Sequence, residues 1–160
     1  MEESAYLVTR RSFVGLMAAA VLGASASATV ADDAMVVVHK DPNCGCCSLW
    51  VQHLRDAGFA VRVEEVADLK AVRARLGVPA ALAACHTAEV AGYVLEGHVP
   101  AEAVRRLLSE RPNAKGIAVP GMPIGSPGME GGQPQPFTVV LFGPDGSRSF
   151  MRFVGKQAVG

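Results

Sequence analysis

The chain has 160 residues, and 50% of them are hydrophobic, which is enough for one domain with a packed core. Its 15 Lys and Arg residues balance 15 Asp and Glu residues, so the formal net charge at pH 7 is zero. A neutral chain with one Trp and few other aromatics has neither the basic surface nor the stacking side chains typical of nucleic-acid-binding proteins. Composition therefore excludes nucleic acid as the expected partner.

Residues 1–31 have the pattern of an export signal rather than of a folded domain. Residues 9–15, TRRSFVG, resemble a twin-arginine signal, and an Ala- and Ser-rich apolar stretch with small-residue cleavage sites follows. This stretch is short and poor in Leu for a membrane span, and an uncleaved anchor is the alternative. We expect a mature domain of residues 32–160 in the periplasm, exported by the twin-arginine pathway and without a stable membrane span of its own.

The turn at residues 40–47, KDPNCGCC, is the feature around which the mature chain is organised. An apolar, β-branched run at residues 35–38 predicts a buried strand before the turn. Residues 48–57 predict a helix after it, which Asp41 or Asn43 would cap. The cysteines of the turn are therefore expected at the N-terminus of a helix.

At such a position Cys44, Cys46 and Cys47 are favoured as thiolates. Unpaired backbone N–H groups and the positive end of the helix dipole stabilise an anion there, and the thiolate is the form that binds soft metals or attacks disulfides. Cys44 and Cys47 have Cys-x-x-Cys spacing, whereas Cys46 adds a sulfur that a plain dithiol motif does not need. Three cysteines buried as small hydrophobes are the alternative, but packing does not require clustering at a turn.

The residues that follow the first helix predict a strand at 59–66 and a second helix at 69–76. Asp68 is placed to cap this second helix, and Gly77 is placed to end it. The resulting β-α-β arrangement is expected to be a right-handed parallel unit.

Cys85, the fourth cysteine, comes after a short Ala-rich turn and is distant in sequence from the other three. Two short strands are predicted at residues 87–90 and 93–99, joined by an Ala-Gly turn, and an amphipathic helix is predicted at 101–110. The whole segment 85–99 is interpreted as an insertion.

Residues 116–136 are rich in Gly and Pro and predict a long loop that contains Met122 and Met129. A loop of this length in a compact domain is usually functional or disordered, and an ordinary exposed loop whose methionines anchor to the core is the alternative. Residues 136–142 predict the clearest strand, and 147–154 its antiparallel mate across a Gly-Pro-Asp-Gly turn.

A β-α-β start and a β-β end, with a cysteine-bearing turn after the first strand, is the plan of a thioredoxin-like domain. We therefore expect an α/β, thioredoxin-like fold with an inserted β segment and a long Gly/Pro-rich loop. The final helix of that plan is not evident after Val154. Pro136 precedes the last clear strand, where thioredoxin-like proteins often place a cis-proline beside the active site.

Several short motifs of the mature chain carry a family resemblance. They are KDPNCGCC at 40–47, CHT at 85–87, GY at 92–93, EGHVP at 96–100 and GMPIGSPGME at 121–130. Together they resemble the CopG-type periplasmic copper-resistance proteins, over nearly all of the mature chain. The resemblance implies a thioredoxin-like fold and copper held by the cysteines, with copper ions and other periplasmic copper-handling proteins as partners.

The residues themselves also favour copper. Thiolate and thioether ligands suit Cu(I), which accepts two or three sulfurs, and thiolates can bridge more than one ion. Zinc, which takes four Cys or His ligands, is the competing metal. The predicted ligands are the four cysteines, Cys44, Cys46, Cys47 and Cys85. The candidates for additional ligands or for orienting contacts are His86, Met122, Met129 and His39. His53 and His98 are expected to be structural or exposed.

Three functions stay open on these grounds. The first is an exported protein that holds Cu(I), and the second is an oxidoreductase that uses the bound copper or the Cys44/Cys47 pair. The third is a thiol–disulfide oxidoreductase with Cys44 as the attacking sulfur, against which Cys46 argues because a neighbouring thiol invites mispairing. The sequence offers no Ser/His/Asp set, phosphate-binding loop or paired carboxylates, so hydrolase and nucleotide-binding functions have no support.

Overall fold

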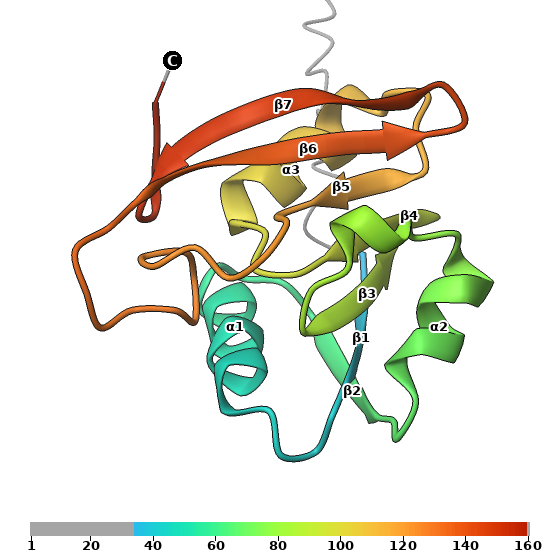
Figure 1. Cartoon of the computed structure of the whole chain (residues 1–160), viewed down its shortest axis with the longest axis horizontal. Helices are drawn as coiled ribbons and strands as arrows, with labels where there is room; N and C mark the ends of the chain where they lie inside the picture. Colours follow the sequence, from blue (N-terminus) through green and yellow to red (C-terminus); the bar gives the residue numbers. More distant parts are fainter. Residues whose placement is uncertain (1–33, 160) are drawn as a thin grey trace, which may run out of the picture.

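A computed structural model describes residues 34–159, so the predicted export signal at residues 1–31 lies outside the described residues. The described part forms one mixed sheet with helices on both faces (Figure 1). In chain order the elements are β1 (Val36–Lys40), α1 (Gly45–Asp56), β2 (Val61–Glu65), α2 (Leu69–Leu76), a 3-10 turn η1 (Ala80–Leu82), β3 (His86–Val90), β4 (Tyr93–Glu96), α3 (Ala101–Glu110), β5 (Gly116–Ala118), β6 (Pro136–Gly143), β7 (Gly146–Val154) and β8 (Gln157–Ala158). None of the helices in this part of the chain is long and apolar enough to cross a membrane.

The strands lie in the order β2-β1-β3-β4-β5-β6-β7-β8. β1 and β2 are parallel, as expected for the β-α-β start, and β4 and β5 are also parallel. The other neighbours are antiparallel, including β1 and β3, in which Lys40 lies opposite His86. Because antiparallel neighbours run in opposite directions, the end of β1 and the start of β3 meet at one edge of the sheet.

Successive side chains of the central strands β4, β5 and β6 pack alternately into two apolar cores, one on each face of the sheet. Leu95, Ile117 and Leu141 belong to the core under α1 and α3, which is closed by Trp50 and other apolar side chains of the two helices. Their sequence neighbours Val94, Ala118 and Phe142 belong to a smaller core under α2 and η1. Since successive residues of a strand point to opposite faces, α1 and α3 cover one face and α2 the other (Figure 1).

Helix α2 is confirmed with the predicted end residues. The Asp68 side chain accepts a hydrogen bond from the backbone N–H of Ala71, and Gly77 ends the helix with φ 71°. The hairpin turn at Ala91–Gly92 is also confirmed between β3 and β4. These elements depend on contacts within a few residues, which the sequence pattern contains.

The start of α1 differs from the prediction. The helix begins at Gly45 with Cys44 at its N-cap, and neither Asp41 nor Asn43 caps it. Instead, the Asp41 carboxylate accepts from the backbone N–H of Asn43, which tightens the turn before the helix. The first turn of α1 is therefore left without a side-chain cap, and its cysteines lie at the end of the helix where free backbone N–H groups favour an anion.

Three further expectations are wrong. Residues 85–99 are no insertion, because β3 pairs directly with β1 and β4 follows it at the centre of the sheet. The loop predicted at 116–136 begins as strand β5, paired with β4 and β6. No peptide bond of the described residues is cis, so Pro136, the first residue of β6, is trans.

Candidate metal centre

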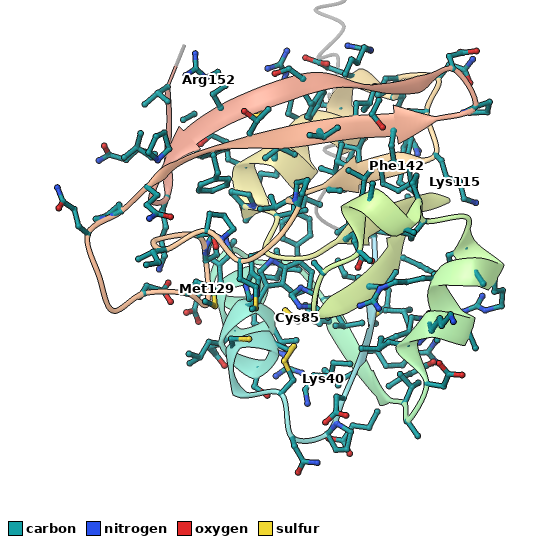
Figure 2. The ribbon with its side chains drawn as sticks, viewed as in Figure 1. Lys40, Cys85, Lys115, Met129, Phe142 and Arg152 are labelled. Carbon is teal, nitrogen blue, oxygen red and sulfur yellow. A yellow bond between two sulfur atoms is a disulfide. The ribbon has the colours of Figure 1, made fainter. Side chains whose placement is uncertain are left out.

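The four cysteines meet at the edge of the sheet where β1 ends and β3 begins. Cys44 is the N-cap of α1, Cys46 and Cys47 lie in its first turn, and Cys85 directly precedes β3. Their four Sγ atoms all lie within 4.8 Å of one another. Figure 2 shows Cys85 with the other sulfur atoms beside it at the start of α1. A site shared by the four cysteines requires Cys85 to lie next to the start of α1, and the structure places it there.

Two of the four sulfurs are joined in a disulfide, Cys44–Cys47, while Cys46 and Cys85 are free. The Cys46 Sγ lies 3.6 Å from the Cys44 Sγ and 3.9 Å from the Cys85 Sγ. In this redox state the cluster offers two thiols. Reduction of the disulfide by two electrons makes all four cysteines available as ligands.

The sulfur of Cys85 lies beside the Cys46 sulfur and the imidazoles of His86 and His98. Burial raises the pKa of its thiol to about 12, and the neighbouring Cys46 adds to the shift because two thiolates repel each other. A bound cation offsets both effects, since its charge stabilises the thiolate and the proton is released on binding. Metal binding at this site would therefore be coupled to loss of the Cys85 proton.

His98 contacts Cys85 most closely and was not expected there. Its Nε2 lies 3.0 Å from the Cys85 Sγ, and its Nδ1 lies 2.8 Å from the carbonyl oxygen of Pro127. A carbonyl only accepts, so Nδ1 carries the proton and Nε2 presents a lone pair to Cys85. Burial lowers the pKa of His98, which keeps the imidazole neutral. The side chain is fully buried, so the expectation of a structural or exposed His98 missed its place at the cluster.

A signal for His98 was present in the hairpin. The β3–β4 register pairs Val90 with Tyr93 and Thr87 with Glu96. Continuing this register two residues beyond the Thr87–Glu96 pair sets Cys85 opposite His98. The predicted Ala-Gly turn would have fixed the same register from the sequence.

His86 lies at the cluster as predicted. It is fully buried, with its Nδ1 3.5 Å from the Cys85 Sγ and its Nε2 without a hydrogen-bond partner. Its ring packs on Trp50, with 4.3 Å between the ring centroids, and edge-on to His98 at 5.0 Å. Burial, with a further contribution from His98, holds its pKa well below the usual range. Cys85, His86 and His98 form a second group whose ligand atoms lie within 4.8 Å of one another.

His39 is not brought to the cysteines. Its two ring nitrogens lie 3.3 Å from the Glu64 carboxylate and 3.0 Å from the Glu89 carboxylate, on the strands at either side of β1. The side chain is buried, and its contacts tie β2, β1 and β3 together.

The loop with the two methionines closes over α1 at one point. A Cβ on Gly128 would lie 2.6 Å from the Cys46 carbonyl oxygen and 2.9 Å from the Trp50 backbone nitrogen, so only glycine allows this approach. Met129, the next residue, is half-buried, whereas Met122 is 54% exposed. The loop therefore holds the residue before Met129 against α1, and Figure 2 shows Met129 beside this helix. Met122 lies at the surface.

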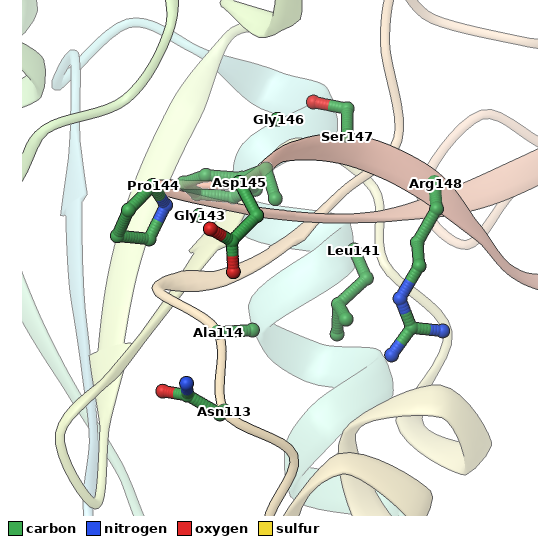
Figure 3. A pocket seen from close by; sticks show the side chains of 10 residues that line it. Asn113, Ala114, Leu141, Gly143, Pro144, Asp145, Gly146, Ser147 and Arg148 are labelled. Atoms are coloured by element: carbon green, nitrogen blue, oxygen red, sulfur yellow. The ribbon is translucent and has the colours of Figure 1, made fainter.

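A separate hollow of about 100 Å³ lies at the turn between β6 and β7 (Figure 3). Its lining includes Asn113, Asp145 and Arg148, and no cysteine, histidine or methionine. This hollow lacks the soft ligands that the cysteine cluster concentrates.

Comparisons with known proteins agree with this site. A family model described as "Protein of unknown function, DUF411" matches residues 82–129. A solved structure entitled "Copper resistance protein copG- Form 1" is 44% identical, covers 76% of this chain and 98% of that chain, and has a TM-score of 0.71. The structure entitled "Copper resistance protein copG- Form 2" is 43% identical, covers 80% and 99%, and has a TM-score of 0.68. No curated protein matches. At this identity over almost the whole length of the solved chains, the chain belongs to the CopG family of copper resistance proteins.

Proposed function

We propose that this protein is an exported copper-binding protein of copper resistance, which holds Cu(I) between Cys44, Cys46, Cys47 and Cys85. The observation that carries the proposal is the convergence of four Sγ atoms within 4.8 Å from two segments of the chain. Thiolates select Cu(I) over harder cations. Because each sulfur has more than one lone pair, the four together suit more than one bridged copper ion.

The neighbouring side chains support this ligand set. His98 and His86 offer neutral imidazoles beside Cys85, and Met129 is the thioether nearest in the chain to the contact of Gly128 with α1. Met122 would become a ligand only if the exposed part of its loop closed over the site. His39 is left out of the proposed set because its nitrogens face two glutamates.

The surrounding fold supports a thioredoxin-like unit. Strands in the order β2-β1-β3-β4, with α1 after β1 and α3 after β4, correspond to the β-α-β start and β-β-α end of that fold. On this proposal β5 to β8 are an extension, residues 32–160 are one domain, and residues 1–31 direct it to the periplasm by the twin-arginine pathway. Other periplasmic copper-handling proteins would then be the partners that deliver or receive the copper.

A redox function is the second candidate, and the Cys44–Cys47 disulfide favours it. The pair would exchange two electrons either with copper bound by the other sulfurs or with a substrate disulfide. The free Cys46 thiol, 3.6 Å from the Cys44 Sγ, lies within reach of this disulfide.

The deciding experiment is a Cu(I) titration of the fully reduced protein under anaerobic conditions, in competition with a colorimetric Cu(I) chelator. We expect tight binding of Cu(I), a preference for Cu(I) over Zn(II), and a large loss of bound copper in Cys46→Ser and in Cys85→Ala. Leu49→Ala, at an exposed position of the same helix turn, is the matched control and should bind as the wild type does. A reduced protein indifferent to Cu(I), or one with metal-free disulfide reductase activity alone, would refute the copper-binding function.

A further inference from the structure

A largely buried ion pair, in which Arg73 is 18% exposed and Glu96 is fully buried, lies beside the cluster but touches none of its sulfurs in the contacts described. The Glu96 carboxylate, with a side chain 0% exposed, accepts a hydrogen bond from Arg73 of α2, with 2.8 Å between Oε1 and Nε. Removing both charges from water costs more than their attraction often returns, and an apolar pair of similar volume is frequently as stable or more so. A pair kept in such a place indicates a role other than stability.

The contacts of this pair converge on the two sides of Cys85. Glu96 Oε1 also accepts from the backbone N–H of Ala84 at 2.6 Å, and Arg73 donates to the Ala84 carbonyl. Glu96 Oε2 accepts from the Thr87 hydroxyl at 2.6 Å. The residue before Cys85 is thus held through both of its backbone polar groups, and the second residue after it through its side chain.

Gly97 completes the restraint from the end of β4. Its N–H donates to the carbonyl oxygen of His86 at 3.0 Å, and a Cβ at this position would lie 2.7 Å from the Ala84 Cβ. The φ of Gly97, 73°, also favours glycine. These contacts restrain the backbone on both sides of Cys85, whose Sγ lies 3.0 Å from the His98 Nε2 and 3.9 Å from the Cys46 Sγ.

We propose that Glu96, held by Arg73, is a positioning residue for the Cys85 sulfur and thereby sets the Cu(I) affinity of the cluster. The inference rests on the proposed Cu(I) site. It adds that α2, which supplies no ligand, contributes through the bond from Arg73 to Glu96. The pair holds the segment that carries the fourth sulfur at the distance at which it can share a metal with the cysteines of α1.

The test compares two variants of the reduced protein with the wild type. Arg73→Met/Glu96→Leu removes both charges together but leaves Ala84 and the Thr87 hydroxyl without these partners. We therefore expect it to unfold at a somewhat lower temperature and, while folded, to bind Cu(I) about ten- to a hundredfold more weakly. Glu96→Gln keeps one acceptor oxygen for both the Ala84 N–H and Arg73, removes the charge, and turns an amide NH2 toward the Thr87 hydroxyl, which can accept instead of donating. We expect its loss of Cu(I) affinity to be smaller than that of the double variant.

A second pair of measurements separates positioning from a general effect on the fold. In a Cys85→Ala background, Glu96→Gln should change the Cu(I) affinity by less than about twofold, because the residue it acts through is gone. A merely structural role would lower the affinity equally in both backgrounds and would overturn the inference. Glu110→Gln, which breaks the exposed Arg106–Glu110 pair of α3, is the control for loss of a carboxylate.

A copper-free readout keeps this inference distinct from the proposed function. In Cys44→Ser/Cys47→Ser protein, diamide takes two electrons and two protons from Cys46 and Cys85 as they form a disulfide, and mass spectrometry follows the rate. Glu96→Gln should slow this reaction several-fold. An unchanged rate, or wild-type Cu(I) affinity in both Glu96 variants, would overturn the positioning role while leaving the copper site standing. Failure of the wild type to bind Cu(I) would instead refute the proposed function. The cross-linking rate would then decide by itself whether Glu96 positions Cys85.

Discussion

The two ends of the sheet differ in what they bury. Around β1, β3 and β4 the buried polar side chains are His39, Lys40, His86, Thr87, Glu96 and His98. Along β6 and β7 the buried side chains are apolar: Val139, Leu141, Phe142 and Phe153. Burying apolar surface stabilises a fold, at roughly 25 cal/mol per Å², whereas a buried polar group costs free energy unless it is bonded. The cysteine end thus buries polar side chains together with apolar ones such as Val38 and Leu95, whereas the side chains buried along β6 and β7 are apolar alone.

The strongest way to test this division is Phe153→Ala in β7. Phe153 is fully buried and stacks on Phe137, with 5.6 Å between the ring centroids. Removing the ring should lower the free energy of unfolding by about 3–5 kcal/mol, because of the lost burial and the cavity left behind. Denaturant unfolding of the reduced apoprotein measures it.

The Cu(I) affinity of the folded Phe153→Ala protein should match that of the wild type, since no side chain at this end contacts the cluster in the interactions described. Val154→Ala, at the next and more exposed position, should change stability far less. A weakened Cu(I) affinity in Phe153→Ala without a loss of stability would contradict the division of the sheet.

A smaller effect, at the boundary between the two ends, is expected for Gly128→Ala. The new methyl group would overlap the Cys46 carbonyl oxygen and the Trp50 nitrogen, in a residue whose φ is 87°. We expect a loss of about 1–3 kcal/mol in unfolding free energy and a weaker Cu(I) affinity, because the loop must move away from α1. Thermal unfolding and the Cu(I) competition titration measure the two effects.

Gly121→Ala is the matched control for Gly128→Ala. Gly121 has a φ of 72° but would place its Cβ with nothing within 4 Å. It carries the same conformational cost without the clash. Equal Cu(I) affinities in the two variants would show that the loop has no influence on the cysteines.

The smallest effect expected is a pH dependence at the junction of α1 and α3. His53 Nε2 accepts a hydrogen bond from the Ala101 N–H, and burial, followed by the charge of Lys156, lowers its pKa. A base whose pKa is lower in the folded state contributes stability above its unfolded pKa of about 6.5, and this contribution is lost as pH falls from there toward the folded pKa. Protonation also removes the acceptor for Ala101.

His53→Gln should therefore flatten the fall in stability of the apoprotein between about pH 6.5 and pH 5, because glutamine does not titrate and its oxygen can still accept. Chemical unfolding at a series of pH values measures this slope. A slope equal to that of the wild type would assign the acid sensitivity to other groups.

Much of the local structure could be predicted because its causes lie within a few residues. The Asp68 cap and the Gly77 end of α2, the Ala91–Gly92 turn and the strand that became β6 all follow from such short-range patterns. The start of α1 was misjudged because the Asp41 carboxylate can accept a hydrogen bond either from a backbone N–H of the helix or from one within the turn. In the structure it accepts from Asn43 in the turn, and the helix has no side-chain cap.

The place of the β3–β4 hairpin was misjudged for a different reason. An alternating apolar pattern predicts a strand but not its neighbours, so residues 85–99 read equally as an insertion or as the centre of the sheet. Pairing with β1 is decided by the packing of the whole sheet against its helices. The same strand pairing places His98 beside Cys85 and His39 between two glutamates.

The sequence by itself determined which ligand chemistry this protein can offer: three cysteines at the start of a helix, a fourth followed by histidine, and two methionines in a Gly/Pro-rich loop. Only the tertiary structure decided that Cys46 and Cys85, 39 positions apart, lie 3.9 Å from each other, and that Glu96 and His98 hold and face the fourth sulfur. The physical reason is that residue type is local, whereas the register of strands distant in sequence depends on the free energy of the whole packed sheet.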